Sequence, residues 1–188
     1  MKSGLIVSKS EKASSFFITM LKRDGYETIL HADTPSAAGR LLNEREIDIC
    51  VIDVPLKDSP GQELAITASE NPACQVILVI KSEYADEVTD QLAPYGILTV
   101  SKPVNQNMFW TALKMTDVMA VRYEKMQQEK LKLQTKLEDL RLINRAKLTL
   151  MTYLNMTEAE AHRYIEKQAM DRRMTRRKVA EGILRTYE

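Results

Sequence analysis

The chain has 188 residues, of which 27 are Lys or Arg and 26 are Asp or Glu, so its formal net charge is +1. Hydrophobic residues make up 44% of the total, which is enough for the core of one domain and a smaller second unit. No apolar run approaches the roughly 20 residues of a membrane-spanning helix. The composition therefore excludes an integral helical membrane protein.

The cysteines and histidines predict neither a disulfide nor a metal centre. Cys50 and Cys74 each lie inside an apolar run, and buried thiols of this kind stay reduced in cytoplasmic proteins. His31 and His162 lack the spacing of metal ligands. The first residues of the chain contain no signal-peptide core. We therefore expect a cytoplasmic protein without a metal site.

Strand and helix patterns alternate over residues 1–117. Short apolar runs predict buried strands, and the segments between them have the period of amphipathic helices. The expected strands are 5–7, 27–31, 47–52, 76–80 and 97–101, and the expected helices are 12–24, 35–43, 64–70, 85–92 and 105–117. Five strands that alternate with helices predict an α/β fold with a parallel, doubly wound sheet, which binds ligands at the carboxyl ends of its strands.

Two charged side chains are expected at that edge of the sheet. Asp53 ends the most apolar strand, with Pro55 and Gly61 behind it, and Lys102 and Pro103 follow the last strand. With the alternating pattern, these residues resemble a two-component receiver domain, which has a flavodoxin-like fold. The resemblance implies that Asp53 stands at the phosphoacceptor position and Lys102 at the position of the receiver-site lysine. It also implies a sensor histidine kinase as a partner in a phosphorelay.

The expected Mg²⁺ site departs from the receiver pattern. A receiver has two acidic residues after its first strand, whereas this chain has Ser8 and Lys9, and Ile80 replaces the hydroxyl residue that usually ends the fourth strand. Mg²⁺ needs oxygen ligands, and phosphoryl transfer needs its charge. We therefore expect a degenerate receiver with a silent Asp53, and Lys9 is a candidate to pair with Asp53 in place of the metal. Phosphorylation of Asp53 without a metal is the alternative.

Residues 118–144 contain neither Gly nor Pro and have the pattern of one long helix. An apolar residue recurs every seven positions, at Met119, Met126, Leu133 and Leu140. The positions four residues later hold Tyr123, Lys130, Leu137 and Asn144, so the seam has two polar interruptions. Such a seam is typical of a coiled coil. We expect the helix to continue from the receiver into the C-terminal segment and to form a parallel homodimer; a single solvated helix is the alternative.

Residues 141–188 predict three short helices. The first carries an apolar stripe at helical spacing, formed by Leu142, Ala146, Leu150, Met151 and Leu154. Asn155 can end that helix in the left-handed conformation. Thr157 and Glu160 fit a capping box for a helix over 158–170. Thr175 can cap the third helix.

The same segment is strongly basic. Eleven Lys or Arg residues stand against six Asp or Glu residues, whereas residues 1–140 carry a net negative charge. Such asymmetry is typical of a protein that binds a polyanion. An ordinary solvated helical surface is the alternative.

Fourteen residues of this segment match the residue types and spacing of one protein family. They are Arg141, Ile143, Ala146, Lys147, Leu150, Met151, Thr157, Glu160, Ala161, Ile165, Ala169, Met170, Val179 and Ala180. In these residues the segment resembles an ANTAR domain, the RNA-binding module of transcription antitermination regulators. Leu148 is a departure, because the family usually has Gly there. The resemblance implies binding to paired hairpins in a leader transcript, whose formation prevents a terminator.

The candidate RNA-binding residues are Lys147, Arg141, Arg145, Arg163, Arg172, Arg173, Arg176 and Arg177. Lys147 comes first because it matches the family motif. Tyr153 and Tyr164 are candidates to stack on unpaired bases, and a dimer suits a target with two hairpins.

The sequence thus predicts a receiver-like domain over residues 1–117, a coiled-coil helix over 118–140 and a three-helix ANTAR domain over 141–188. The predicted function is that of an RNA-binding response regulator, a transcription antiterminator. Two alternatives are a DNA-binding response regulator, whose helices imitate a helix-turn-helix, and a protein-interaction adaptor that uses the coiled coil. The sequence contains no nucleophile–base pair and no phosphate loop, so we do not expect an enzyme. With Asp53 silent, the input signal would be another partner or a small ligand.

Overall fold

The computed structural model describes residues 2–56 and 59–187. The chain divides into two compact units, residues 1–124 and residues 125–188. Met1 and Glu188, the outer ends of the predicted domains, lie outside the described residues. Within the described part, no helix is long and apolar enough to cross a bilayer.

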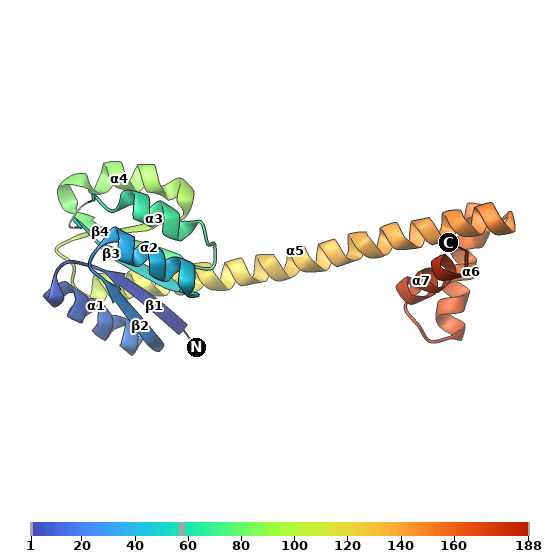
Figure 1. The fold of residues 1–188 in the computed structure, drawn as a ribbon, viewed down its shortest axis with the longest axis horizontal. Helices are drawn as coiled ribbons and strands as arrows, with labels where there is room; N and C mark the ends of the chain where they lie inside the picture. Colours follow the sequence, from blue (N-terminus) through green and yellow to red (C-terminus); the bar gives the residue numbers. More distant parts are fainter. Residues whose placement is uncertain (1, 57–58, 188) are drawn as a thin grey trace. The chain divides into compact units, whose positions relative to one another are not determined.

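The first unit contains a five-stranded sheet (Figure 1). Its strands are β1 (Lys2–Val7), β2 (Tyr26–Ala32), β3 (Ile49–Asp53), β4 (Gln75–Lys81) and β5 (Leu98–Lys102). They pair in the order β2-β1-β3-β4-β5, and every pair is parallel. This order is that of a flavodoxin-like, doubly wound sheet, so the predicted fold class is confirmed.

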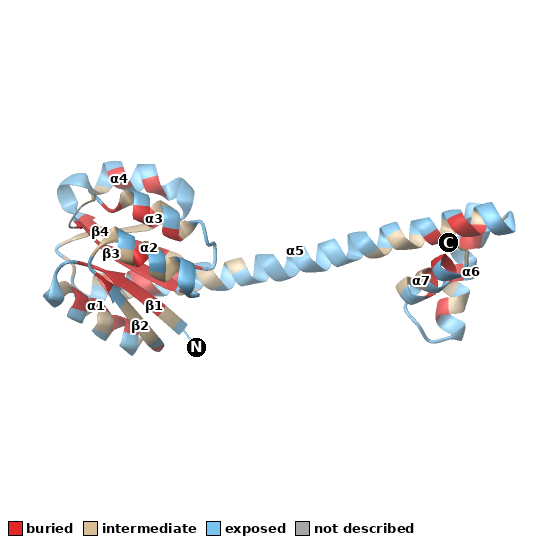
Figure 2. Ribbon diagram, viewed as in Figure 1, coloured by how far each residue is buried: buried red, intermediate tan, exposed pale blue. Residues whose placement is uncertain are grey.

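Helices cover both faces of this sheet, because alternate residues of each strand point to opposite sides. The helices that connect the strands are α1 (Glu11–Arg23), α2 (Pro35–Glu44), α3 (Gln62–Ser69) and α4 (Ala85–Leu92). Short 3₁₀ turns flank α4, at Ser82–Tyr84 and Ala93–Tyr95. One core lies under α2, α3 and α4, and the other lies under α1 and the first turns of α5 (Gln106–Leu154) (Figure 2).

Local signals explain where these helices begin. The side chains of Ser10 and Thr34 accept hydrogen bonds from backbone N–H groups in the first turns of α1 and α2. Gly61 precedes α3 with a φ of 83°, and a β-carbon there would collide with the side chain of Val54. The loop that follows Asp53 therefore requires glycine at this position.

The buried cysteines belong to the core under α2, α3 and α4. Cys50 and Cys74 are both free thiols in the described structure. Burial raises the pKa of Cys74 to about 12, and it raises the pKa of Cys50 as well. Both side chains therefore act as small apolar residues.

The second unit is a three-helix arrangement built on the end of α5. Helix α5 is continuous from Gln106 to Leu154, as the sequence predicted, and is followed by α6 (Glu158–Asp171) and α7 (Arg176–Tyr187). Asn155 has a φ of 52° directly after α5. The capping box of Thr157 and Glu160 is present at the start of α6. The Thr175 hydroxyl accepts a hydrogen bond of 3.3 Å from the backbone N–H of Lys178.

Small residues let the three helices approach closely. The core of this unit contains Ala146 and Leu150 from α5, Ala161 and Ile165 from α6, and Ala180 from α7. The predicted apolar stripe of α5 is correct except at its end. Leu154 is exposed, because it lies in the last turn of α5, just before the chain reverses at Asn155.

Candidate functional site

A cavity of about 700 Å³ lies in the second unit, where α5, α6 and the start of α7 meet. Its apolar lining is formed by Leu140, Ile143, Ala169 and Met174. Its polar and charged lining is formed by Lys136, Asp139, Asn144, Lys147, His162, Thr175, Arg176 and Arg177. An apolar surface is thus bordered by four side chains that carry a permanent positive charge.

Helical spacing explains why α5 supplies half of these residues. Lys136, Leu140, Ile143 and Lys147 stand at positions i, i+4, i+7 and i+11, which lie along one side of a helix. The loop before α7 contributes Met174. The cavity therefore depends on the reversal of the chain after α6.

Acidic partners hold the cations of the cavity in defined positions. The Lys147 ammonium lies 2.8 Å from a carboxylate oxygen of Glu158, and the Lys147 side chain is only 14% exposed. The hydrogen bond from Lys147 lowers the pKa of the Glu158 carboxyl. Arg177 donates hydrogen bonds to Asp139 at 2.8 Å and to Glu181 at 3.0 Å.

Arg176 belongs to the same set of ion pairs. Its guanidinium lies 3.2 Å from a Glu166 carboxylate oxygen, and the His162 ring lies 3.4 Å from the same oxygen. Ion pairs at the surface contribute little to stability. They do fix where the positive groups point, which lowers the conformational entropy lost when an anion binds.

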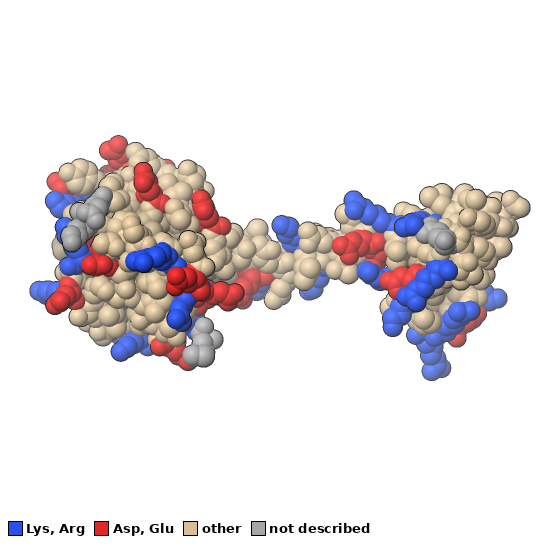
Figure 3. Space-filling view, viewed as in Figure 1, with Lys and Arg blue, Asp and Glu red and all other residues tan. Residues whose placement is uncertain are grey.

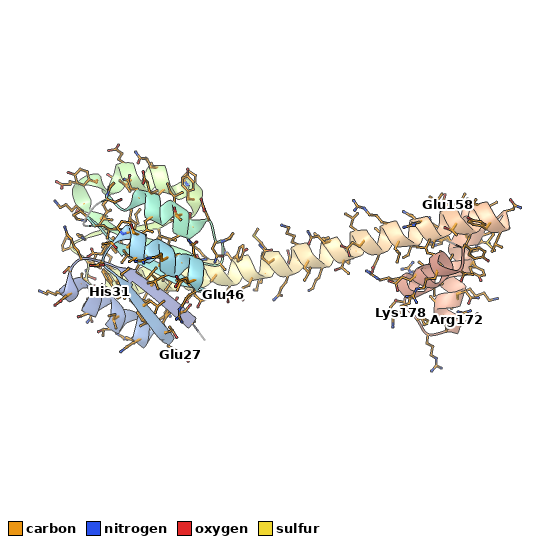
Figure 4. All side chains as sticks on the ribbon, viewed as in Figure 1. Glu27, His31, Glu46, Glu158, Arg172 and Lys178 are labelled. Atoms are coloured by element: carbon orange, nitrogen blue, oxygen red, sulfur yellow. The ribbon has the colours of Figure 1, made fainter. Side chains whose placement is uncertain are left out.

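The structure brings together only some of the predicted RNA-binding residues. Lys147, Arg176 and Arg177 line the cavity. The others lie elsewhere on the unit with exposed side chains, namely Arg141, Arg145, Arg163, Arg172 and Arg173. Figure 3 shows basic side chains gathered over the second unit, and Figure 4 labels Arg172 at the end of α6 and Lys178 on α7.

Sequence reasoning missed Lys136, His162 and Met174. Lys136 was detectable in principle, because it precedes Lys147 by 11 residues on the same side of a predicted helix. His162 and Met174 reach the cavity only through the packing of α6 and of the loop before α7. No sequence pattern predicts that packing.

The aromatic candidates lie apart from the cavity lining. The Tyr153 ring is exposed and stacks on the Tyr187 ring, with a distance of 5.5 Å between their centroids. Tyr164 is exposed to a smaller extent. Tyr153 therefore presents one ring of a stacked pair at the surface.

At the predicted phosphoacceptor position, Asp53 belongs to a cluster of polar side chains. Asp53 is buried, and its two carboxylate oxygens have different partners. The Lys102 ammonium lies 2.6 Å from one oxygen, and the Ser8 hydroxyl donates a 2.7 Å hydrogen bond to the other. Lys102 also donates to the backbone carbonyl of Val54. The expected pairing of Lys9 with Asp53 is wrong: Lys9 is exposed, and Lys102 supplies the positive charge.

These residues do not fit Mg²⁺, the ion that a receiver fold implies. Among the residues that the structure describes, no group of three or more His, Cys, Asp or Glu side chains is placed to hold a metal ion. Mg²⁺ is bound through carboxylate oxygens and waters. Here a neutral Ser8 hydroxyl stands beside Asp53 in place of a carboxylate, and the Lys102 ammonium already neutralises Asp53.

Comparison with known proteins assigns the second unit. Residues 131–184 match the family model of the ANTAR domain. The chain contains an ANTAR domain. All the lining residues of the cavity, from Lys136 to Arg177, fall inside this domain.

Similar proteins were found both for most of the chain and for the fold of its first unit. The transcriptional regulatory protein PdtaR of two Mycobacterium tuberculosis strains is 26% identical over 167 residues, which cover 89% of this chain and 82% of PdtaR. A receiver domain of an HD domain-containing protein from Pseudomonas fluorescens Pf-5 matches with a TM-score of 0.56 and 21% identity, over 65% of this chain and 92% of that one. The response regulator TrrA from Thermotoga maritima matches with a TM-score of 0.53 and 19% identity, over 62% of this chain and 99% of the TrrA chain. The chain thus joins a first unit with a receiver fold to a segment that matches the ANTAR family model.

Proposed function

We propose that this protein is a cytoplasmic response regulator that binds RNA hairpins in leader transcripts and thereby prevents transcription termination. The observation that carries the proposal is the basic cavity inside the ANTAR domain. A role in transcription agrees with the name of PdtaR, a transcriptional regulatory protein. We propose no enzymatic activity.

The cavity suits an unpaired nucleotide of a hairpin loop. Sequence-specific RNA recognition targets loop bases, which unstack and bind to side chains, while phosphates bind cationic groups. Ile143 and Met174 offer an apolar surface for a base, and a thioether packs well against an aromatic ring. Lys147 and Arg176 lie beside that surface and provide positive charge for the adjoining phosphates.

The proposed RNA-binding form is a parallel dimer. Met126, Leu133, Leu137 and Leu140 of the predicted seam have exposed side chains on α5. A row of apolar side chains at heptad spacing is the usual contact of a coiled coil. Two ANTAR domains linked in this way would bind two hairpins with higher avidity than one domain binds one hairpin.

We propose that the receiver unit is regulated without Mg²⁺-dependent phosphorylation of Asp53. The Lys102 ammonium and the Ser8 hydroxyl already satisfy the carboxylate. A phosphodonor would have to displace both partners without a metal to neutralise the developing charge. We therefore propose that the input signal is another partner or a small ligand and not a sensor histidine kinase.

The test starts from the full chain and the RNA that it retains. Ultraviolet crosslinking to total cellular RNA, followed by sequencing, would identify the enriched transcripts, which we expect to carry paired hairpins. Gel-shift titration would then compare the enriched hairpin RNA with a DNA duplex of the same sequence. Binding to RNA should weaken steeply with salt, because phosphate contacts release counterions.

Lys147→Met tests the cavity directly, since it removes the charge and keeps an apolar chain of similar length. We expect a loss of at least about tenfold in hairpin affinity, the range of a charge-assisted contact. Lys132→Met is the matched control, because Lys132 is an exposed lysine of α5 outside the cavity lining. Equal affinities of the two variants would remove the cavity from the RNA site, and preference for the DNA duplex would contradict the proposed function.

A further inference from the structure

A second cavity, of about 420 Å³, lies beside Asp53 in the receiver unit. Its lining includes the polar side chains of Ser10, Lys12, Asp53 and Lys102 and the apolar side chains of Phe16 and Val104. Cavities of this size hold small molecules in many proteins. This cavity lies beside the predicted phosphoacceptor position, where a working receiver would hold Mg²⁺ and where Ser8 and Lys9 led us to expect no metal.

The charge around this cavity favours an anion. Lys102 and Asp53 neutralise each other through their 2.6 Å contact. Lys12 remains, and it has no ion-pair partner among the side chains in residues 2–56 and 59–187. Lys12 lies in the first turn of the 13-residue helix α1, where the helix dipole also favours negative charge. The cavity thus carries a net positive charge.

The rest of the lining favours an apolar body on the same ligand. Phe16 is half-buried, and its ring packs against Phe17 and Phe109 with centroid distances of 5.3 and 5.9 Å. Pro103 and Val104 add further apolar surface to the lining. Such walls bind hydrocarbon or aromatic groups through the hydrophobic effect.

We propose that the receiver unit binds a small organic anion in this cavity, with a carboxylate or phosphate group at Lys12 and an apolar body against Phe16 and Val104. The ligand has the opposite charge to the metal ion of a working receiver. Ligand binding takes the place of phosphorylation as the input of this unit. The proposal concerns the receiver unit alone and stands or falls independently of RNA binding.

The position of the cavity links it to the start of α5. Val104 directly precedes Asn105, whose side-chain oxygen accepts a 2.8 Å hydrogen bond from the backbone N–H of Met108. The Phe17 ring lies 4.9 Å from the Phe109 ring of α5. A ligand against Val104 and Phe16 therefore lies next to residues that cap α5 or pack against its first turns.

The test is calorimetric titration of the full chain with four probes. Benzoate and phenyl phosphate combine an anionic group with an aromatic body, benzamide has the body without the charge, and inorganic phosphate has the charge without the body. We expect at least one of the first two to bind saturably and at least about tenfold more tightly than benzamide and inorganic phosphate. Backbone amide shifts in an NMR titration should change at Ser10, Ala13 and Val104.

Lys12→Met supplies the decisive variant, because Lys12 is exposed and the substitution keeps its apolar stem. We expect it to weaken binding of the anionic probe by about tenfold or more. Lys22→Met is the matched control, since Lys22 is an exposed lysine in the last turn of the same helix. The proposal is overturned if neither aromatic anion binds below about 10 mM, if benzamide binds equally well, or if the two variants behave alike.

Discussion

The heptad seam of α5 predicts a dimer, and an exposed leucine outside the seam provides the control for testing it. Leu133 lies in the heptad pattern and is 66% exposed, whereas Leu131 lies outside it and is 64% exposed. The two positions are about 160° apart around the helix. We therefore compare Leu133→Gln with Leu131→Gln, because Leu and Gln have similar helix propensities.

The expected magnitude follows from the exposed fraction of Leu133. Burying a whole Leu side chain contributes about 1.5–3 kcal/mol. With two thirds of the Leu133 side chain available for burial, each copy contributes roughly 1–2 kcal/mol and a dimer roughly 2–4 kcal/mol. A loss of about 3 kcal/mol raises the dimer Kd by roughly 100-fold.

Sedimentation equilibrium of the full chain over a range of concentrations measures this Kd. Leu133→Gln should shift the dimer to monomer at concentrations where the unchanged chain and Leu131→Gln remain dimeric. If both variants weaken the dimer equally, the heptad assignment is wrong. If the unchanged chain sediments as a monomer, the coiled-coil hypothesis is refuted.

Other predictions concern the ANTAR domain and the phosphoacceptor position. Glu158→Gln should strengthen hairpin binding by about threefold in a gel shift, because the carboxylate no longer competes with phosphate for Lys147; weaker binding would speak against a phosphate contact. In a carbon-detected NMR titration, the Glu158 carboxyl should have a pKa below its usual value, because Lys147 donates a hydrogen bond to the ionised form. The ion pair should therefore persist at neutral pH and be lost as the pH falls through that lowered pKa. Lys147→Met should raise the pKa of Glu158. Leu150→Ala should cost about 2–5 kcal/mol and melt the domain at lower temperature by circular dichroism, whereas Leu148→Ala, at an exposed position, should melt near the original temperature. Incubation with a small phosphodonor and Mg²⁺ should add no mass at Asp53, and a phosphorylated Asp53 in the mass spectrum would contradict the degenerate receiver.

The sequence predicted the elements well because their signals are local. Apolar runs located all five strands, and the reversal at Asn155 and the capping box of Thr157 and Glu160 were recognisable from single residue types. The inward face of α5 was also correct at Ala146 and Leu150. Periodicity defines a face but not where its contacts end, which is why Leu154 was misplaced.

The sites were predicted less completely, because they depend on packing between distant segments. Replacement of an acidic residue by Ser8 indicated that the metal site was lost, but not that the Ser8 hydroxyl would bond to Asp53, 45 residues away. Lys147 was found through the family motif. Its companion His162 comes from α6, and only the folded unit brings it to the same cavity.

The unbroken hydrogen-bonded ladder of α5 restricts how this part of the chain can change in length. One extra residue between Met126 and Leu133 would rotate everything beyond it by about 100°. The seam side chains before the insertion would then lose their angular alignment with the cavity side chains after it. Seven extra residues would complete two turns and nearly restore it. Insertions and deletions in this stretch should therefore be tolerated in steps of seven residues and disruptive at other lengths.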